Sequence, residues 1–310
     1  MAKEEPKKSF ISASLRPRIE NFKTTLRLLM KNPGSAVGLI IVLFYVAIAL
    51  IDEIYPALFG FSQANIGILI PNYYNVGPNP PTMAHLFGTT YPGIDIFQGV
   101  IKAARIDLAV TFLVVGAGAL IGIILGLYAA FYGGIVDEIL MRITDIFFTI
   151  PLLVLIIAAG FFISWGRTLI GLAVILIIVW WPTYARVVRG QVLSIKELSY
   201  IEAARASGVG NIKTMFKHIL PNTLSPVIVQ LSFDLATVVL LMATLDFLGF
   251  IPSGGYLADW GLLSAIGSYY MVTGDWWTIV FPGFVILIFA LSMNLVGDGL
   301  RDAFDPRLRR

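Results

Sequence analysis

The side chains that could do catalytic chemistry are few in this chain of 310 residues, and their spacing does not suit catalysis. There is no cysteine, and the two histidines, His85 and His218, do not form a His-Glu-x-x-His pair. The sequence also lacks the Gly-x-Ser-x-Gly turn of serine hydrolases and the Gly-x-x-x-x-Gly-Lys-Ser/Thr loop that binds nucleotide phosphates. It therefore predicts no catalytic residue, no metal site and no ATP hydrolysis by this chain.

One polar stretch separates two strongly apolar segments, and its spacing predicts two short helices. Ser199 and Glu202 have the Ser-x-x-Glu spacing of a capping box, so the first helix should begin directly after Ser199. Gly208 can end this helix in a left-handed conformation. Asn211 can then cap a second helix, which Pro221 limits because proline has no N–H and its ring clashes with the preceding turn.

The first of these helices carries the sequence Glu202-Ala203-Ala204-Arg205-Ala206-Ser207-Gly208. Its alanines leave so little side chain on the surface that the backbone of a partner could approach closely. We interpret this polar stretch, residues 200–220, as a docking element. The alternative is an ordinary helical hairpin at the membrane surface.

Asp234 is the one ionisable residue that clearly falls deep inside an apolar segment. Counted from Pro226, it lies about 12 Å along a helix that rises 1.5 Å per residue, where an unpaired carboxylate costs several kcal/mol. We therefore expect its carboxylate to face a wet translocation pathway or a partner. The alternative is a structural hydrogen bond to a neighbouring helix.

Membrane-spanning helices must position these residues. The chain is 57% hydrophobic and only 13% charged, with a mean hydropathy of +0.84, which is typical of a polytopic membrane protein. Its net charge of +3 is small, and no stripe of basic residues suits nucleic acid. The N-terminal tail lacks the small-residue cleavage site of a signal peptide, so the first apolar run should remain as an anchor.

Six apolar runs approach the length of about 20 residues that crosses about 30 Å of hydrocarbon. The third contains Arg142 and Asp145, a pair three residues apart that could partly neutralise itself, and Pro151, which should kink it. The predicted fold is an all-α protein with six transmembrane helices. The runs cover residues 34–51, 108–132, 139–163, 168–186, 226–250 and 277–297.

The basic residues predict that both termini are cytoplasmic. Of the 22 Lys and Arg residues, 18 fall on the side of the termini, and Lys102, Arg105 and Arg167 fall on the other. The resulting segments are a cytoplasmic tail at 1–33, a first helix at 34–51, an extracytoplasmic loop at 52–107, a five-helix core at 108–297 with a cytoplasmic loop at 190–225, and a cytoplasmic tail at 298–310.

Two segments on the opposite side, 52–107 and 251–276, are long and rich in aromatic residues. Long loops in compact proteins usually have a function, so these could form a platform for an external binding protein. Alternatively, their aromatic side chains form an interfacial belt that anchors the ends of the spans.

Gly118, Gly122 and Gly126 recur every four residues along the second apolar run. This spacing removes side chains from one face of the helix, so that another helix can pack very close to it. The neighbour could belong to another subunit or to this chain.

Residues 294–307, Asn-Leu-Val-Gly-Asp-Gly-Leu-Arg-Asp-Ala-Phe-Asp-Pro-Arg, predict a helix that leaves the bilayer and ends in a compact polar knot. They are similar to the C-terminal signature of one of the two permeases in the dipeptide/oligopeptide/nickel branch of ABC importers. Glu202-Ala203-Ala204 with Gly208 resembles the E-A-A-x-x-x-G loop of the same permeases. Other matches are residues 27–33, His85 to Thr89 with Gly93, Asp95 and Arg105, and Phe247-Leu248-Gly249 with Trp260-Gly261.

The resemblance implies a type I ABC importer permease that binds no cofactor itself and lies among membrane lipids. Its implied partners are a second homologous permease, two cytoplasmic ATPase subunits that bind ATP and Mg, and an extracytoplasmic substrate-binding protein. The implied substrates are peptides, with oligosaccharides or nickel as alternatives. The residues implied to contact the ATPase are Glu202, Ala203, Ala204, Arg205, Gly208, Asn211 and Pro221.

Two alternatives come from other classes of protein. An ion-coupled carrier would need several ionisable residues near the midplane, and only Asp234 clearly qualifies. A membrane-embedded enzyme would need catalytic motifs that the sequence lacks. The chain also departs from the ABC family pattern, because Thr90 and Ile94 replace charged residues and a glutamate is missing near Met242, although Asp246 follows.

Overall fold

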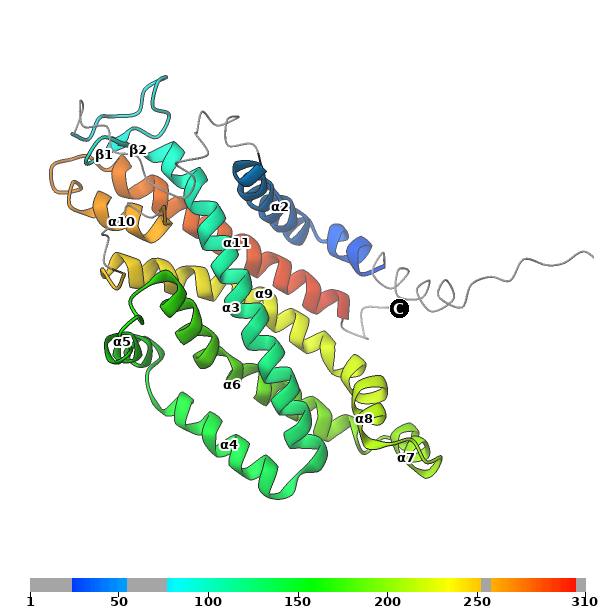
Figure 1. The fold of residues 1–310 in the computed structure, drawn as a ribbon. Helices are drawn as coiled ribbons and strands as arrows, with labels where there is room; N and C mark the ends of the chain where they lie inside the picture. Colours follow the sequence, from blue (N-terminus) through cyan, green and yellow to red (C-terminus); the bar gives the residue numbers. More distant parts are fainter. Residues whose placement is uncertain (1–23, 55–76, 252–257, 305–310) are drawn as a thin grey trace, which may run out of the picture.

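The structure is a computed structural model that describes residues 24–54, 77–251 and 258–304 of the chain (Figure 1). Five of its helices are long and apolar enough to cross a membrane, and a sixth span results if one bent helix pair is counted as a single span. The prediction of an all-α protein with six spans is therefore confirmed. The five are α2 (Pro33–Ile54), α3 (Ile96–Tyr132), α6 (Leu169–Ile195), α9 (Leu220–Phe247) and α11 (Trp277–Phe304).

The helix α3 begins at Ile96, twelve residues before the apolar run that predicted it. Asp95 caps it, because its side chain accepts a hydrogen bond from the backbone N–H of Gln98 at 3.0 Å. The antiparallel strands β1 (Thr89–Thr90) and β2 (Ile94–Asp95) lead directly into this cap. Hydropathy alone missed this first part of the helix because it includes Lys102 and Asp107, which are both buried.

The last helix, α11, also exceeds its apolar run. It stays helical to Phe304, so the compact knot expected after residue 297 is wrong for the described part of the tail. Gly299 explains the continuation, because a Cβ at this position would lie 2.5 Å from the Cβ of Ser35 in α2. The absence of a side chain allows α11 to pack against the start of α2 along this extra turn.

The third apolar run is broken rather than kinked. It forms α4 (Gly134–Thr149) and α5 (Leu152–Phe162), which meet at Pro151 with a bend of 95°. The expected self-neutralising pair of Arg142 and Asp145 is not what the structure shows. Asp145 instead pairs with Arg186 of α6 at 2.5 Å.

A second ion pair also joins α4 to α6, since the Arg189 guanidinium donates to both carboxylate oxygens of Asp137 at 2.5 and 2.6 Å. Bidentate pairs of this kind fix orientation as well as distance. Thr144 is the one side chain of α4 that is buried. Two ion pairs therefore connect α4 to α6, alongside the edge contact of the Phe147 and Trp181 rings.

The row of Gly118, Gly122 and Gly126 packs against α6 of the same chain. A Cβ on Gly122 would lie 2.6 Å from the Cβ of Tyr184, and one on Gly126 would lie 2.9 Å from the Cα of Ala185. Such distances leave no room for a side chain, so α3 and α6 touch backbone to backbone. The glycine face is thus occupied by internal packing.

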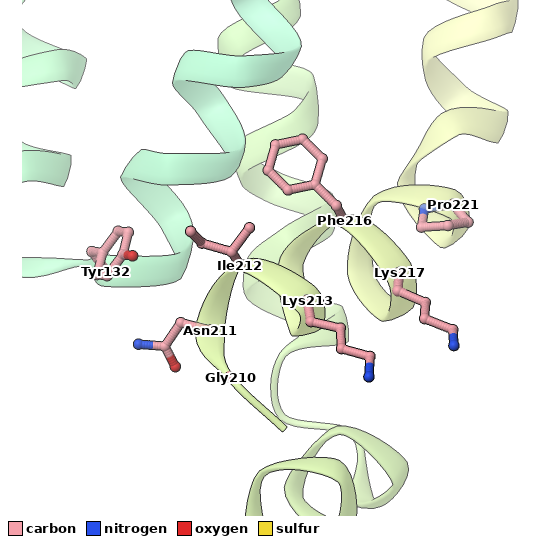
Figure 2. Close-up of a pocket in the computed structure, with 8 residues that line it drawn as sticks. All are labelled: Tyr132, Gly210, Asn211, Ile212, Lys213, Phe216, Lys217 and Pro221. Atoms are coloured by element: carbon pink, nitrogen blue, oxygen red, sulfur yellow. The ribbon is translucent and has the colours of Figure 1, made fainter. Parts of the chain in front are cut away.

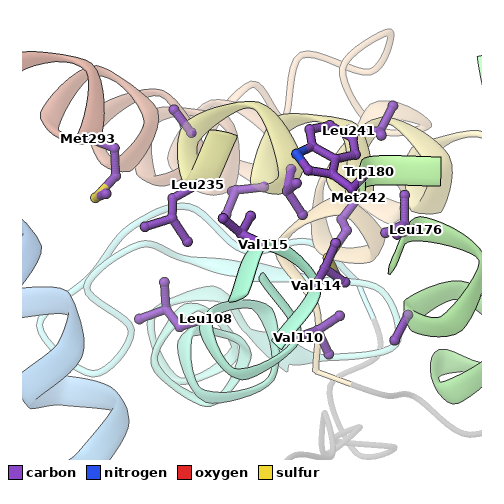
Figure 3. Packing of buried hydrophobic residues seen from close by; sticks show 14 of the residues in the cluster. Leu108, Val110, Val114, Val115, Leu176, Trp180, Leu235, Leu241, Met242 and Met293 are labelled. Atoms are coloured by element: carbon purple, nitrogen blue, oxygen red, sulfur yellow. The ribbon is translucent and has the colours of Figure 1, made fainter. Parts of the chain in front are cut away.

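The hydrophobic core surrounds α3, which runs diagonally through the bundle (Figure 1). The β-hairpin lies at one end of this helix, and the helices of the polar stretch lie at the other. Figure 3 shows that α3, α6, α9 and α11 all contribute to the core; its labelled members include Val110, Val114, Val115, Leu176, Trp180, Leu235, Leu241, Met242 and Met293.

Candidate functional site

The polar stretch folds into α7 (Ser199–Ala206), α8 (Asn211–Lys213) and a π-helical turn, η3 (Thr214–Ile219), which leads into α9. Gly208 ends α7 with a φ of +78°, as predicted. The N–H of Gly208 donates to the Arg205 carbonyl at 2.9 Å, and that of Val209 donates to the Ala204 carbonyl at 3.1 Å. These two bonds form a Schellman motif, which reverses the chain sharply after α7.

The predicted capping box is wrong. Leu198 occupies the N-cap of α7, and no side chain caps this helix. The chain turns directly out of α6, through a bond from the Leu198 N–H to the Ile195 carbonyl at 3.1 Å, so Ser199 is already helical. Asn211 is likewise the first residue of α8 and not its cap, because Gly210 takes that position.

Pro221 was predicted to end the second helix, but the structure shows that it does not. The helical conformation continues from Asn211 to Phe247, and Pro221 lies in the first turn of α9. The π turn explains this, since its last bond runs from the Leu220 N–H back to the Met215 carbonyl. A proline at the start of a helix lacks only an N–H that has no intrahelical partner there. The docking element is therefore continuous with α9.

The helix α7 exposes most of its surface and is anchored by Ile201, its one buried residue. Glu202, Ala203 and Arg205 are exposed, and Ala204 is half-buried. Four of the residues assigned to docking, Glu202 to Arg205, therefore lie on one accessible helix, whereas Gly208 follows it, Asn211 lies in α8 and Pro221 lies in α9.

Three side-chain contacts surround the junction between α6, α7 and the neighbouring spans; two of them involve α7 itself. The Lys196 ammonium donates to the carbonyl of Ala130 at 3.1 Å, and the Arg205 guanidinium lies 4.9 Å from the centre of the Phe131 ring. Both contacts reach the last turn of α3. In addition, Asn222 of α9 donates to the Tyr200 hydroxyl at 3.3 Å. Movement of α7 is thereby linked to α3 and to the start of α9.

An open groove of about 1050 Å³ lies beside the docking element. Figure 2 shows its lining, which combines the end of α3 with α8, the π turn and the start of α9. Two of the predicted site residues belong to it. The lining residues are Tyr132, Gly210, Asn211, Ile212, Lys213, Phe216, Lys217 and Pro221.

Asp234 is only 6% exposed, and one of its two carboxylate oxygens is hydrogen-bonded. The Gln230 side chain donates to its Oδ1 at 2.9 Å, whereas its Oδ2 has no hydrogen-bond partner among the described residues. Gln230 also lines an open groove of about 430 Å³, together with Arg301. The Asp234 carboxylate is thus buried, and only the Gln230 side chain connects it to the open groove.

The sequence did not single out a second group of buried acids, formed by Asp107, Asp246 and Asp259 where α3, α9 and α10 (Trp260–Ser268) meet. Asp107 accepts a bond from the Trp260 backbone N–H at 3.1 Å, and Asp259 caps α10 by accepting from the Leu262 N–H at 2.8 Å. The first of these bonds fastens α10 to α3, and the second caps α10. The usable signal was the position of Asp107, directly before a predicted span.

At the hairpin end, His85 Nδ1 and Asp95 Oδ2 lie 2.6 Å apart, within hydrogen-bond distance. Two residues quoted for the family resemblance therefore hold the hairpin to the cap of α3. In the described residues 24–54, 77–251 and 258–304, no group of His, Cys, Asp or Glu is arranged to hold a metal ion.

The described chain is thus a bundle of helices long and apolar enough to cross a membrane, with the exposed short helix α7 at one end. Residues 122–310 match the family described as "Binding-protein-dependent transport system inner membrane component". The chain belongs to this family, whose members have the type I ABC importer permease fold.

Relatives of the chain extend the match to as much as 94% of its length. It is 35% identical to the dipeptide transport system permease protein DppC of Alkalihalophilus pseudofirmus, over 94% of this chain and 91% of the relative. It is 39% identical to the probable D,D-dipeptide transport system permease protein DdpC of Escherichia coli, over 74% and 75%. It is 37% identical to the glutathione transport system permease protein GsiD of Pectobacterium atrosepticum, over 74% and 75%.

Family membership settles the class of function. The chain is a multi-pass cell-membrane protein and a permease subunit of an ABC importer, not an enzyme. Permeases of this family carry no cofactor themselves, and the family implies an ATPase and a substrate-binding protein as partners.

Proposed function

We propose that this chain forms half of a pathway through which peptides enter the cell. The observation that carries the substrate class is that its relatives are named for dipeptides, D,D-dipeptides and glutathione, all of them peptides. These names favour peptides over the oligosaccharides and nickel that the sequence left open.

The complete transporter would contain a second homologous permease, two ATPase subunits that bind ATP and Mg, and an external substrate-binding protein. Both termini of this chain would be cytoplasmic, in agreement with the distribution of Lys and Arg. In this orientation α7 faces the ATPase, whereas α10 and the β-hairpin face the binding protein.

The coupling contact is assigned to α7, with Glu202 and Ala203 on its exposed face and Gly208 shaping its end. When ATP closes the two ATPases, they would displace α7. The contacts of Lys196 and Arg205 with the last turn of α3 would pass this displacement to the spans, which would then move as rigid bodies between inward- and outward-open states.

Asp234 is proposed to act on the translocation pathway through Gln230, because this glutamine joins the buried carboxylate to an open groove. A peptide carries an ammonium group at its N-terminus, which a carboxylate in a poorly solvated place would attract. In this view Asp234 supplies negative potential and Gln230 holds the carboxylate in position.

Replacement of Ala203 by tryptophan tests the coupling assignment. The residue is exposed, so the side chain should be tolerated by the isolated permease but should hold an ATPase surface away from α7. We expect Ala203→Trp to pair normally with the second permease and to lose ATPase subunits on purification, whereas Ala203→Ser should retain them. Full retention by Ala203→Trp would refute docking at α7.

Uptake by the reconstituted transporter, supplied with its binding protein, tests the substrate class. We expect ATP-dependent accumulation of a labelled dipeptide and none of a labelled oligosaccharide or of nickel. Accumulation of either of the latter without peptide uptake would overturn the assignment to peptides.

A further inference from the structure

The groove beside the docking element lies at the level where two spans end. Tyr132 is the last residue of α3, and Pro221 is in the first turn of α9. Aromatic residues gather at this end of α3, since the rings of Tyr128 and Tyr132 stack with their centres 5.9 Å apart. Tyrosines are enriched where membrane helices meet the lipid headgroups, so the groove opens at the headgroup region.

Three apolar side chains of the groove are exposed in this chain. Ile212 is 65% exposed, Tyr132 is 51% exposed and Phe216 is 42% exposed. Figure 2 shows Ile212 and Phe216 on neighbouring turns beside the end of α3. Exposed apolar residues next to a span end are stable against the upper part of lipid acyl chains, whereas in water each would be unfavourable.

The polar part of the groove is basic. Lys213 and Lys217 are four residues apart, one helical turn, and Figure 2 shows their side chains extending to the same side. The lining includes no acidic residue, and neither lysine forms an ion pair with the described part of the chain. Two adjacent ammonium groups without a counter-charge favour an anionic ligand.

We propose that the groove binds the headgroup of an anionic phospholipid. Lys213 and Lys217 would contact its phosphate, and Ile212, Phe216 and Tyr132 would contact the adjoining acyl region. Basic pockets between the cytoplasmic ends of membrane helices suit such headgroups. The inference rests on the proposed function for one point only, the orientation that places this end of the bundle in the cytoplasmic leaflet.

A bound lipid would do more than fill the groove. Its lining joins the end of α3 to α8 and the π turn, so a lipid there would hold the second helix of the docking element against the membrane surface. When the ATPase displaces α7, the bound lipid would then keep α8 from moving away from the bilayer. We expect anionic lipid to raise binding-protein-stimulated ATP hydrolysis by the complete transporter.

The test compares two pairs of basic residues on the same side of the membrane. Lys213→Gln with Lys217→Gln removes the groove charges. Arg27→Gln with Lys31→Gln removes two exposed charges that are also four residues apart but lie outside the groove. Phosphatidylglycerol is titrated into the purified transporter in detergent, and the bound lipid is counted by native mass spectrometry.

We expect the groove variant to bind phosphatidylglycerol about 30-fold more weakly, the ratio that corresponds to about 1 kcal/mol for each lysine near an anionic surface. The control variant should bind as the unchanged protein does. In liposomes, phosphatidylglycerol added to phosphatidylcholine should stimulate ATP hydrolysis by the control but not by the groove variant. Inorganic phosphate at millimolar concentration should not displace the lipid.

Two results would overturn the proposal. Equal weakening in both variants would mean general attraction of basic residues to anionic lipid and not a site. Loss of ATPase subunits from the groove variant with unchanged lipid binding would show that the groove contacts protein. Lipid binding can also be measured on the two permeases without ATPase subunits. Such binding should be seen even if Ala203→Trp retains its ATPase, so the two hypotheses can fail independently.

Discussion

Gly208 and Gly210 offer a matched test of the docking element, since they are two residues apart and differ chiefly in backbone conformation. Gly208 has a φ of +78°, and Gly210 has a φ of −64° and a ψ of 154°. Neither has a neighbouring atom within 4 Å of the place that a Cβ would occupy. Replacing each by serine therefore isolates the effect of the left-handed conformation from that of steric contact.

Serine at 208 must adopt a left-handed conformation that costs an L-residue about 1–2 kcal/mol. Serine at 210 keeps an extended conformation and is a better N-cap than glycine by a few tenths of a kcal/mol. The closed Schellman turn should thus become about 5- to 30-fold less populated in Gly208→Ser, because 1.4 kcal/mol corresponds to a factor of ten. In Gly210→Ser it should be unchanged or slightly more populated.

Hydrogen exchange of the Val209 N–H reports on this turn directly, since that group donates to the Ala204 carbonyl. We expect faster exchange by the same factor in Gly208→Ser, together with weaker ATPase retention on purification. Equal exchange in the two variants would refute the assignment of strain to Gly208. Faster exchange with full retention would mean that the turn does not shape the docking surface.

Three further predictions concern the spans and their orientation. Gly126→Val should destabilise the protein by about 1–3 kcal/mol because α3 and α6 must separate, whereas Gly116→Val, which meets no atom within 4 Å, should leave the thermal midpoint in detergent unchanged. Asp234→Asn should preserve assembly and slow peptide uptake, and equal uptake by Asp234→Leu would reduce this residue to packing. A cysteine at Val272, which is 94% exposed, should react with an impermeant thiol reagent in intact cells, whereas one at Ser207 should react only in opened vesicles.

Periodicity and hydropathy predict the spans well because burial in lipid demands long apolar runs, but they fail where a helix continues beyond the bilayer. The first twelve residues of α3 include Lys102 and Asp107, whose polar groups are buried against the protein and not against lipid. A hydropathy window reads such residues as a loop. The Asp95 cap at the true start is a local signal that the apolar run obscured.

The docking element shows a different limit of prediction from the sequence. The φ of Gly208 follows from its own chemistry, and its left-handed conformation was predictable. The roles of Ser199, Asn211 and Pro221 depend on where the neighbouring helices end, because a helix start one residue earlier turns a cap into a first helical residue. For Asp234, the hydrogen-bond partner Gln230 is visible four residues earlier in the sequence, but the burial of the carboxylate is not.

The length of α3 has a mechanical consequence. Its 37 residues make a rod of about 55 Å, whereas the hydrocarbon layer is about 30 Å thick. If α3 moves as a rigid body, it should pivot about a point inside the bilayer. A tilt of about 10° around its middle would carry each end about 5 Å, in opposite directions. A displacement of the Phe131 end would thus move the β-hairpin end in the opposite direction. One end of the pathway would close as the other opens.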